Sequence, residues 1–398
     1  MPSPLRICVV GDLDGMHTHR WVRWFVEQGH EVHAISYYPP RRSPPGVTVH
    51  SLVGGAASRA PLGGPDRAGW RPAARRLAEA AAPSLWRLVN GLRYQRRGLG
   101  RTIGNVEPDV IHAHYVVEHG FYTALASRRP LVVSAWGSDV LVAPTRSPLT
   151  RAIVRYTVRR ADLVTSNNEY MCRRLVELGA PPDRVALVVL GADAFFVEAP
   201  EASVNLRPDG ETPPTVISVR SLDSRLYNVD VILRAIVPVR RRVPDARLLV
   251  AGDGRLRAGL ERLALRLGLG EAVTFLGRLD REALRDTLAS SHVYVSVPRS
   301  DATAVSTLEA MAVGCFPIVS DLPSQEELVQ DGENGFRVPV GRAGALAERI
   351  VEALQRPDLR RAALAPNRDL VRRRGLLEEN MARMEELYRG LSRSREGT

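Results

Sequence analysis

The chain contains no lysine, so its 55 Lys-or-Arg positions are all arginine. Cysteine is also scarce: Cys8, Cys172 and Cys315 stand in apolar contexts, without metal-site spacing and too few for a disulfide framework. They predict small core residues in a reducing cytoplasm. No stretch approaches 18 uninterrupted apolar residues, so no membrane-spanning helix is predicted. The first residues, MPSPLRICVVGDLDG, run into a strand without a signal-peptide pattern, so we expect a cytoplasmic protein.

Aromatic residues make up only 6% of the chain, and no RNA- or DNA-binding motif accompanies its formal charge of +11. Nucleic acid is therefore not a predicted partner, although the charge alone suggests one. The charge is uneven, because residues 1–200 contain 25 Arg and 16 acidic residues, whereas residues 201–398 contain 30 and 28. The N-terminal half thus favours an anionic partner or surface.

Short apolar runs alternate with helical patterns along most of the chain, which is typical of parallel, doubly wound α/β sheets. The predicted strands are residues 6–10, 32–36, 109–112, 131–134, 163–166 and 185–190, then 215–219, 247–251, 272–276, 293–297 and 316–320. The main helical patterns are residues 17–28, 118–127, 148–160, 170–178 and three segments after Ala345. A Pro- and Glu-rich linker is predicted at residues 198–214. Two Rossmann-like halves with a ligand cleft at their strand ends are expected.

The most informative segment is residues 293–321, VYVSVPRSDATAVSTLEAMAVGCFPIVSD. It predicts a buried strand, a loop that starts at Asp301, a helix that carries Glu309, and a second buried strand. The helix N-terminus, at about Ala304–Thr307, offers backbone N–H groups to an anion. Two carboxylates beside an anion site suit a ligand with hydroxyls and phosphates, such as a nucleotide sugar.

This segment resembles the acid–x7–acid signature of retaining, nucleotide-sugar-dependent glycosyltransferases of the GT-B fold, family 4. Residues 308–314, LEAMAVG, match the family's Glu-Ala-Met-Ala-x-Gly run, and Asp301 stands where a Glu is usual. The resemblance implies that Glu309 binds the ribose hydroxyls and Asp301 the donor sugar's hydroxyls. The donor-binding residues that it implies at the helix start are Thr303, Ala304, Val305, Ser306 and Thr307. The alternative interpretation is a generic βαβ unit.

The resemblance also places donor-binding residues after other strands of the second half. Arg220 matches the family arginine that holds the donor diphosphate, and Arg225 has a suitable offset for the family's lysine, although alignment of the next helix favours Tyr227 or Asn228. Gly252 lies in a turn near the nucleotide, and Arg278 is expected to cover the base. A solvated surface arginine is the alternative interpretation for both Arg225 and Arg278.

In the first half, the resemblance implies a site near the donor diphosphate and the acceptor. It lies in the loop that ends at Gly15 and in the helix that begins near His17. Asp109–Tyr115, DVIHAHY, ends a strand, and His114 is a candidate acceptor ligand; a structural histidine is the alternative. In SAWGSD, Trp136 replaces the family histidine. Trp136 is expected to stack on a sugar or to pack in the core, and Asp139 to bind hydroxyls as a catalytic residue.

The predicted domains are an acceptor-binding domain at 1–197, a nucleotide-sugar-binding domain at 198–375, and a helix at 376–398 that, by resemblance, crosses back onto the N-terminal domain. Its expected packing face is Leu376, Met381, Met384 and Leu387, unless the helix packs on its own domain. No metal ion or cofactor is expected besides the nucleotide sugar, because no D-x-D motif stands in a strand context. The oligomeric state is not predicted.

The resemblance implies transfer of a sugar from a UDP- or GDP-linked donor to a hydroxyl or amine, with retention. The expected acceptor is a small molecule or lipid-linked, and residues 67–101, with nine Arg, one acid and two Trp, would suit a lipid-linked one. Such a basic helix suits an anionic membrane, and a solvated helix is the alternative. Rival functions are a nucleotide-sugar epimerase or hydrolase of the same fold, and a catalytically lapsed nucleotide-sugar-binding protein.

Overall fold

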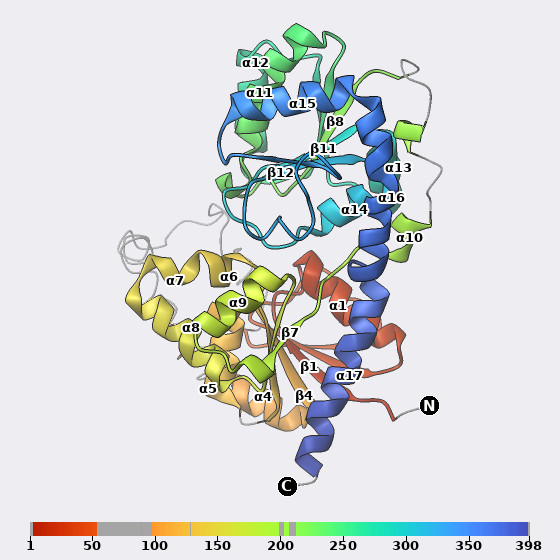
Figure 1. Ribbon diagram of the computed structural model, residues 1–398. Coiled ribbons are helices and arrows are strands. Elements are labelled where there is room, and N and C mark those ends of the chain that lie inside the picture. The colour runs from red at the N-terminus through yellow and green to blue at the C-terminus, as the bar shows by residue number, and fades with distance from the viewer. Residues whose placement is uncertain are drawn as a thin grey trace. The chain divides into compact units, whose positions relative to one another are not determined.

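The structure, a computed structural model, describes residues 3–53, 89, 92, 98–127, 129–198, 203–206 and 212–396. Contacts between Cα atoms divide the chain into two compact units. One comprises Met1–Val188 with Met381–Thr398, and the other is Val189–Asn380. Each unit is an α/β domain built on one parallel sheet (Figure 1).

The first unit contains a seven-stranded sheet in the order β3-β2-β1-β4-β5-β6-β7, with every neighbouring pair parallel. The strands are β1 (Arg6–Val10), β2 (Glu31–Ser36), β3 (Val47–Ser51), β4 (Val110–His114), β5 (Leu131–Ser134), β6 (Leu163–Ser166) and β7 (Val185–Leu187). The strand order reverses between β1 and β4. Ligands of doubly wound sheets bind at the carboxyl ends of the strands at such a point.

The helices of this unit are α1 (Met16–Glu27), α4 (Leu99–Val106), η2 (Val116–Gly120), α5 (Phe121–Ala126), α6 (Ser138–Leu141), α7 (Ala143–Arg146), α8 (Pro148–Arg160), α9 (Glu169–Glu177) and η3 (Pro182–Arg184). Side-chain caps explain where two of them start. Ser147 accepts a hydrogen bond from the Thr150 N–H before α8, and Asn168 accepts one from the Met171 N–H before α9.

The second unit contains a six-stranded sheet in the order β10-β9-β8-β11-β12-β13, again parallel throughout. The strands are β8 (Thr215–Val219), β9 (Arg247–Ala251), β10 (Val273–Gly277), β11 (Val293–Ser296), β12 (Phe316–Ser320) and β13 (Phe336–Val338). Its helices are α10 (Ala194–Val197), η5 (Val204–Leu206), η6 (Arg225–Tyr227), α11 (Val229–Arg242), α12 (Arg257–Arg266), α13 (Arg281–Ala289), α14 (Val305–Val313), α15 (Ala343–Gln355) and α16 (Pro357–Arg374). The strand order reverses between β8 and β11.

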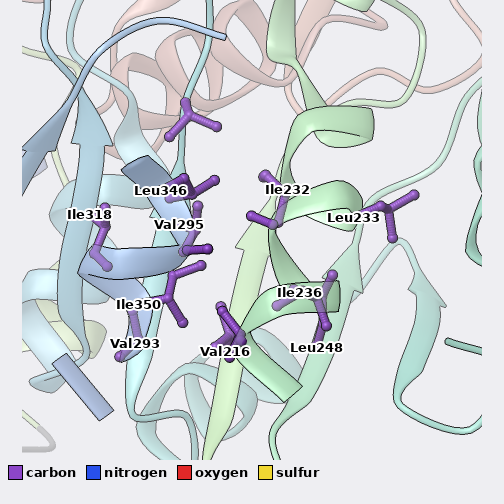
Figure 2. Close-up of a cluster of buried hydrophobic side chains, with 14 of the residues drawn as sticks. Val216, Ile232, Leu233, Ile236, Leu248, Val293, Val295, Ile318, Leu346 and Ile350 are labelled. Atoms are coloured by element: carbon purple, nitrogen blue, oxygen red, sulfur yellow. The ribbon is translucent and has the colours of Figure 1, made fainter. Parts of the chain in front are cut away.

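The core of the second unit lies where α11 and α15 pack side by side on the sheet (Figure 2). Ile232 and Ile236 of α11 meet Ile350 of α15 and the valines and leucines of the strands beneath them. All three isoleucines are fully buried, and each such side chain stabilises the fold by about 1.5–3 kcal/mol. This packing fixes β8 and β11, the two strands whose ends carry the site described below.

The last helix, α17 (Leu377–Glu396), belongs from Met381 onwards to the first unit. Its buried residues there are Met381, Met384 and Tyr388, whose i, i+3, i+7 spacing marks one helical face. The expected face is thus corrected at two positions: Leu376 lies outside the helix, and Tyr388, on the same side as Met381, takes the place of the half-buried Leu387. Leu376 precedes the helix and pairs through its backbone with Ala192.

The segment expected to be a linker is in part packed. Asn205 is buried and donates hydrogen bonds to the carbonyl oxygens of His292 and Gly314, at 3.0 and 2.9 Å, and Arg360 donates to its amide oxygen at 2.8 Å. The second unit accordingly begins at Val189 and includes this turn. The basic helix expected over 67–101 lies almost wholly outside the described residues. Within the described parts of the chain, no helix is long and apolar enough to cross a membrane.

Candidate functional site

A buried ion pair lies at the order reversal of the second sheet. Arg220 directly follows β8 and donates from Nε to the Ser296 hydroxyl, at the end of β11, at 2.8 Å. Its Nη2 group also contacts that hydroxyl and forms an ion pair with the Asp301 carboxylate. The side chains of Arg220 and Asp301 are only 10% and 17% exposed. The structure therefore brings together two residues that sequence reasoning predicted separately.

The ion pair keeps Arg220 charged in a partly dry environment. Burial by itself lowers the pKa of Arg220, but the charges of Asp301, Tyr294 and Tyr227 outweigh burial, so its pKa is raised. The guanidinium carbon also lies 5.2 Å from the ring centre of Tyr227. Nη1 makes no hydrogen bond to any residue that the structure describes. One edge of the guanidinium is thus fixed, and another remains for a ligand.

The loop between β11 and α14 is held from both sides. Asn228, which has a left-handed backbone with φ of 52°, donates from its amide to the Val297 carbonyl at 2.9 Å. Ser324 donates to the carbonyl oxygen of Asp301 at 2.7 Å. Sequence reasoning did not assign these supporting roles or the role of Ser296, because no motif signals such distant partners. The hydrogen bonds of Asn228 and Ser324 thus hold the loop that carries Asp301 of the ion pair.

Helix α14 begins at Val305, and Ala304 caps it without a side-chain hydrogen bond. Its first N–H groups therefore have no capping side chain, as an anion-binding helix start requires. The hydroxyls of Ser306 and Thr307 bond to the Tyr294 hydroxyl at 2.8 and 3.3 Å, so these two side chains are engaged within the domain. Buried Glu309 lies one turn further along.

Three other residues predicted to bind the donor take no part in the ion pair. Arg225 and Arg278 are exposed, and neither forms a hydrogen bond or ion pair through its side chain with the described residues. Arg278 follows the edge strand β10, two strands from β8. Gly252 has φ of +138°, and a Cβ there would lie 1.9 Å from the Arg220 carbonyl oxygen. Gly252 thus permits the turn that carries Arg220.

The second cluster lies at the order reversal of the first sheet. His114 ends β4, and its Nδ1 lies 2.9 Å from the Thr18 hydroxyl of α1. The buried Nε2 atom has no hydrogen-bond partner in the described parts of the chain. Burial is the main cause that holds the pKa of His114 well below its usual range. The nearby rings of His112, His119 and His17 lower this pKa further, so the His114 ring is neutral.

Two aromatic side chains adjoin His114. Exposed His17 stacks on Trp136 with ring centres 5.0 Å apart and planes 11° apart. Trp136 in turn meets His114 edge-on, at 5.3 Å. The three residues predicted to bind the acceptor therefore lie together in one domain. Gly15, in extended conformation, precedes α1 and donates its N–H to the Asp12 carbonyl at 3.2 Å.

Asp139 does not have the geometry of the hydroxyl-binding catalytic residue that was predicted. It is fully buried, and its carboxylate accepts the N–H groups of Val116 at 2.9 Å, Gly137 at 2.9 Å and Trp136 at 3.1 Å. Burial raises its pKa to about 6, against the lowering effect of these N–H groups. Asp139 therefore fixes the loop that carries Trp136.

A buried chain of polar groups supports this cluster and was not predicted. His112 lies two residues before His114, on the same strand face; its Nε2 is 2.7 Å from the Ser134 hydroxyl, and its Nδ1 hydrogen-bonds to the Tyr388 hydroxyl. The Tyr388 hydroxyl also accepts from Trp21 Nε1 at 3.1 Å. Burial lowers the pKa of His112 to about 3, so the imidazole stays neutral.

Comparison with known families gives a single answer. The family model described as "Glycosyl transferases group 1" matches residues 205–367, and "Glycosyl transferase 4-like domain" matches residues 15–191. The chain belongs to the group 1 glycosyltransferases. The acid-containing segment that carries Asp301 and Glu309 lies within the first match. Among the described residues, no cluster of three His, Cys, Asp or Glu side chains could hold a metal ion.

Several relatives of this glycosyltransferase are themselves named as glycosyltransferases. It is 28% identical to a D-inositol 3-phosphate glycosyltransferase of Nocardia farcinica, over 94% of this chain and 82% of that one. It is 29% identical to the alpha-D-kanosaminyltransferase of Streptomyces kanamyceticus, over 71% of this chain and 75% of that one. HepE of Anabaena, in complex with UDP and glucose, has a similar structure, with a TM-score of 0.71, 18% identity and coverage of 96% and 99%. This likeness shows the GT-B fold.

Proposed function

We propose that this glycosyltransferase moves a sugar from a UDP- or GDP-linked donor to a hydroxyl or amine of its acceptor, with retention of anomeric configuration. The observation that carries the proposal is the geometry of Arg220. Two groups of its own domain fix the guanidinium, and Nη1 is left for a ligand at the order reversal of the sheet. A diphosphate is the ligand that suits this fixed positive charge.

Within this proposal, the second domain binds the donor. Arg220 and the start of α14 stabilise the negative charge that develops on the leaving diphosphate. Arg225, which is exposed and unpaired among the described side chains, adds a second guanidinium when the donor binds. Asp301 accepts hydrogen bonds from the donor sugar's hydroxyls, and Glu309 accepts those of the ribose.

The proposed reaction breaks the bond between the anomeric carbon and the diphosphate oxygen, and the electron pair stays on the diphosphate. The acceptor oxygen or nitrogen forms its bond to the anomeric carbon on the same face, and its proton passes to the leaving oxygen. This route retains the anomeric configuration with no protein nucleophile. We also propose that it needs no metal ion, because the guanidinium and helix charges neutralise the diphosphate.

The first domain is the proposed acceptor domain. The stacked rings of His17 and Trp136 offer a flat surface for a sugar ring or another cyclic acceptor. His114 is neutral because it is buried, and its Nε2 has no hydrogen-bond partner among the described residues, so it suits a hydrogen bond to an acceptor hydroxyl. A small molecule and a lipid-linked glycan both meet these requirements.

The test begins with thermal shift of the purified chain in a panel of nucleoside diphosphates and nucleotide sugars, since a ligand that binds only the folded state raises the melting temperature. Transfer is then followed by NMR, which reports the anomeric configuration of the product, with and without EDTA. Arg220→Ala is expected to abolish diphosphate binding, and Glu309→Gln to weaken it. Arg262→Ala, on the exposed face of α12, is the matched control and should bind as the parent chain does. An Arg220→Ala variant with undiminished transfer would refute the proposal.

A further inference from the structure

Five arginines cluster on and beside helix α8 without acidic neighbours. Between Asp139 and Asp162 the sequence contains no acidic residue, and its arginines are Arg146, Arg151, Arg155, Arg159 and Arg160. None of the five forms an ion pair with a described residue. Elsewhere in this domain arginines do pair, as Arg129 does with Glu107 and Arg174 with Glu177. The α8 segment therefore places five arginines in 22 consecutive residues, 140–161, that contain no acidic residue.

The helix presents two parallel rows of side chains away from the sheet. Its inner face buries Ile153, Val154 and Val158. On its outer face, Arg151, Arg155 and Arg159 follow one another at intervals of four residues, which aligns them in one row. Leu149, Ala152 and Tyr156 form the adjacent row. Figure 1 shows α8 beside α7 and α5 at the edge of the domain.

The second row is unusually apolar for an exposed surface. Leu149 and Tyr156 are 41% and 42% exposed, among the most exposed large apolar side chains described. A shallow hollow of about 460 Å³ lies at Tyr156, lined by Ala152, Arg155, Tyr156, Arg159 and Arg160. A row of guanidinium groups next to a row of apolar groups is the pattern of a helix that lies at a membrane interface.

We propose that this outer face of α8, made by Leu149, Arg151, Ala152, Arg155, Tyr156 and Arg159, binds the surface of an anionic lipid bilayer. The arginines contact lipid phosphates, while Leu149 and the Tyr156 ring enter the boundary between headgroups and acyl chains. A purely anionic partner such as RNA would use the arginines but would leave the apolar row in water. The excess of arginine over acid in residues 1–200 adds long-range attraction to the same partner.

The experiment is sedimentation of the full chain with vesicles of phosphatidylcholine alone or mixed with phosphatidylglycerol, at low and high ionic strength. The chain is expected to sediment with the mixed vesicles, less so at high salt, and not to sediment with vesicles of phosphatidylcholine alone. The variant Arg151→Gln/Arg155→Gln/Arg159→Gln should bind on the order of 100-fold more weakly, since each arginine near an anionic surface contributes about a factor of five.

The matched control removes the same charge from another exposed surface. Arg241→Gln/Arg262→Gln/Arg266→Gln alters α11 and α12, where these side chains are exposed and unpaired among the described residues. This variant should bind vesicles as the parent chain does. Equal binding by the α8 variant would overturn the proposal and would assign the contact to another segment, such as residues 67–101. Binding of RNA without binding of vesicles by the parent chain would also overturn it.

A second variant tests the apolar row without a change of charge. Leu149→Ser should weaken binding to anionic vesicles several-fold at unchanged melting temperature, whereas a purely electrostatic contact would leave the binding unchanged. The α8 variants should still release the nucleoside diphosphate from a donor at the parent rate, because they lie outside the proposed sites. Vesicle binding tests the membrane proposal and donor turnover tests the proposed sugar transfer, so the failure of one can be told from the failure of the other.

Discussion

A Cβ atom on Gly252 would lie 1.9 Å from the carbonyl oxygen of Arg220. The close approach links the turn after β9 to the turn after β8, and Gly252 has φ of +138°, which other residues rarely adopt. Any side chain at residue 252 must therefore displace the backbone that positions the Arg220 guanidinium against Ser296 and Asp301.

Gly252→Ala is expected to lower stability by about 1–3 kcal/mol, the usual magnitude of such backbone strain, and to weaken nucleoside diphosphate binding at least ~10-fold. Urea unfolding and isothermal titration calorimetry measure the two effects. Gly259→Ala is the control, because nothing lies within 4 Å of a Cβ there and the residue is helical. Diphosphate binding by Gly252→Ala at the parent affinity would separate this turn from the donor site.

The Arg220–Asp301 ion pair makes a second prediction. Asp301→Asn leaves a largely buried guanidinium without its counter-charge, so we expect a loss of about 1–3 kcal/mol, below the 3–5 kcal/mol of a fully buried pair. The exposed pair of Arg242 and Glu348 is the control, and Glu348→Gln should change stability by less than about 0.5 kcal/mol. Equal losses from the two substitutions, measured by urea unfolding, would contradict the role of the buried pair.

The pattern of the sequence was sufficient to predict most of the sheets, because central parallel strands are continuous apolar runs. The strands predicted at residues 6–10, 215–219 and 316–320 have the same bounds as β1, β8 and β12. The edge strand β3, VTVHS, was not predicted, since its side chains are half-buried or exposed and form no such run. The three-residue strand β13 is too short to leave a periodic signal.

The site was predicted less completely, because its contacts join residues far apart in the sequence. Arg220 and Asp301 were each predicted from motifs, but their mutual ion pair spans 81 positions. The positioning role of Asp139 was missed, because no sequence pattern reveals that its carboxylate accepts the N–H of Gly137 in its own loop and that of Val116, 23 positions away. Tyr388, 276 residues from His112, had no local signal beyond the helical spacing of its buried neighbours.

The buried histidines predict loss of stability in acid. Burial lowers the pKa of His112 to about 3, and burial also lowers those of His114 and His119, from an ordinary value of 6.5. Below pH 6.5 the unfolded chain therefore binds more protons than the folded chain, and the free energy of unfolding falls as pH falls. Asp139 acts oppositely, since its folded pKa of about 6 exceeds its ordinary 3.8, so its contribution is present in acid and lost as pH rises through about 6.

The lowered pKa values of these three histidines outweigh the raised pKa of the one carboxyl, so the parent chain should lose stability between pH 6 and pH 4. His112→Gln should reduce the slope of unfolding free energy against pH by about 1.4 kcal/mol per pH unit, the value for one proton. Urea unfolding at a series of pH values measures the slope. A slope unchanged by His112→Gln would show that His112 is not held neutral in the fold.

Tyr388 provides the last prediction, because its hydroxyl bonds to both Trp21 and His112 while the Trp21 ring meets His114 edge-on at 5.3 Å. Tyr388→Phe keeps the ring but leaves two buried nitrogens without their partner, which should lower the free energy of unfolding by about 1–3 kcal/mol. If the chain of contacts positions His114, the variant should also raise the KM for the acceptor while the KM for the donor stays unchanged.

The control for that variant is Tyr156→Phe, which removes a hydroxyl from the same type of ring on the exposed face of α8, where it forms no hydrogen bond with a described residue. Because Tyr388 belongs to the first domain and the proposed donor site to the second, a purely structural role predicts lower stability with both KM values unchanged. Steady-state kinetics well below the melting temperature of the variant distinguish the two outcomes. A rise in the donor KM instead of the acceptor KM would contradict the assignment of His114 to the acceptor.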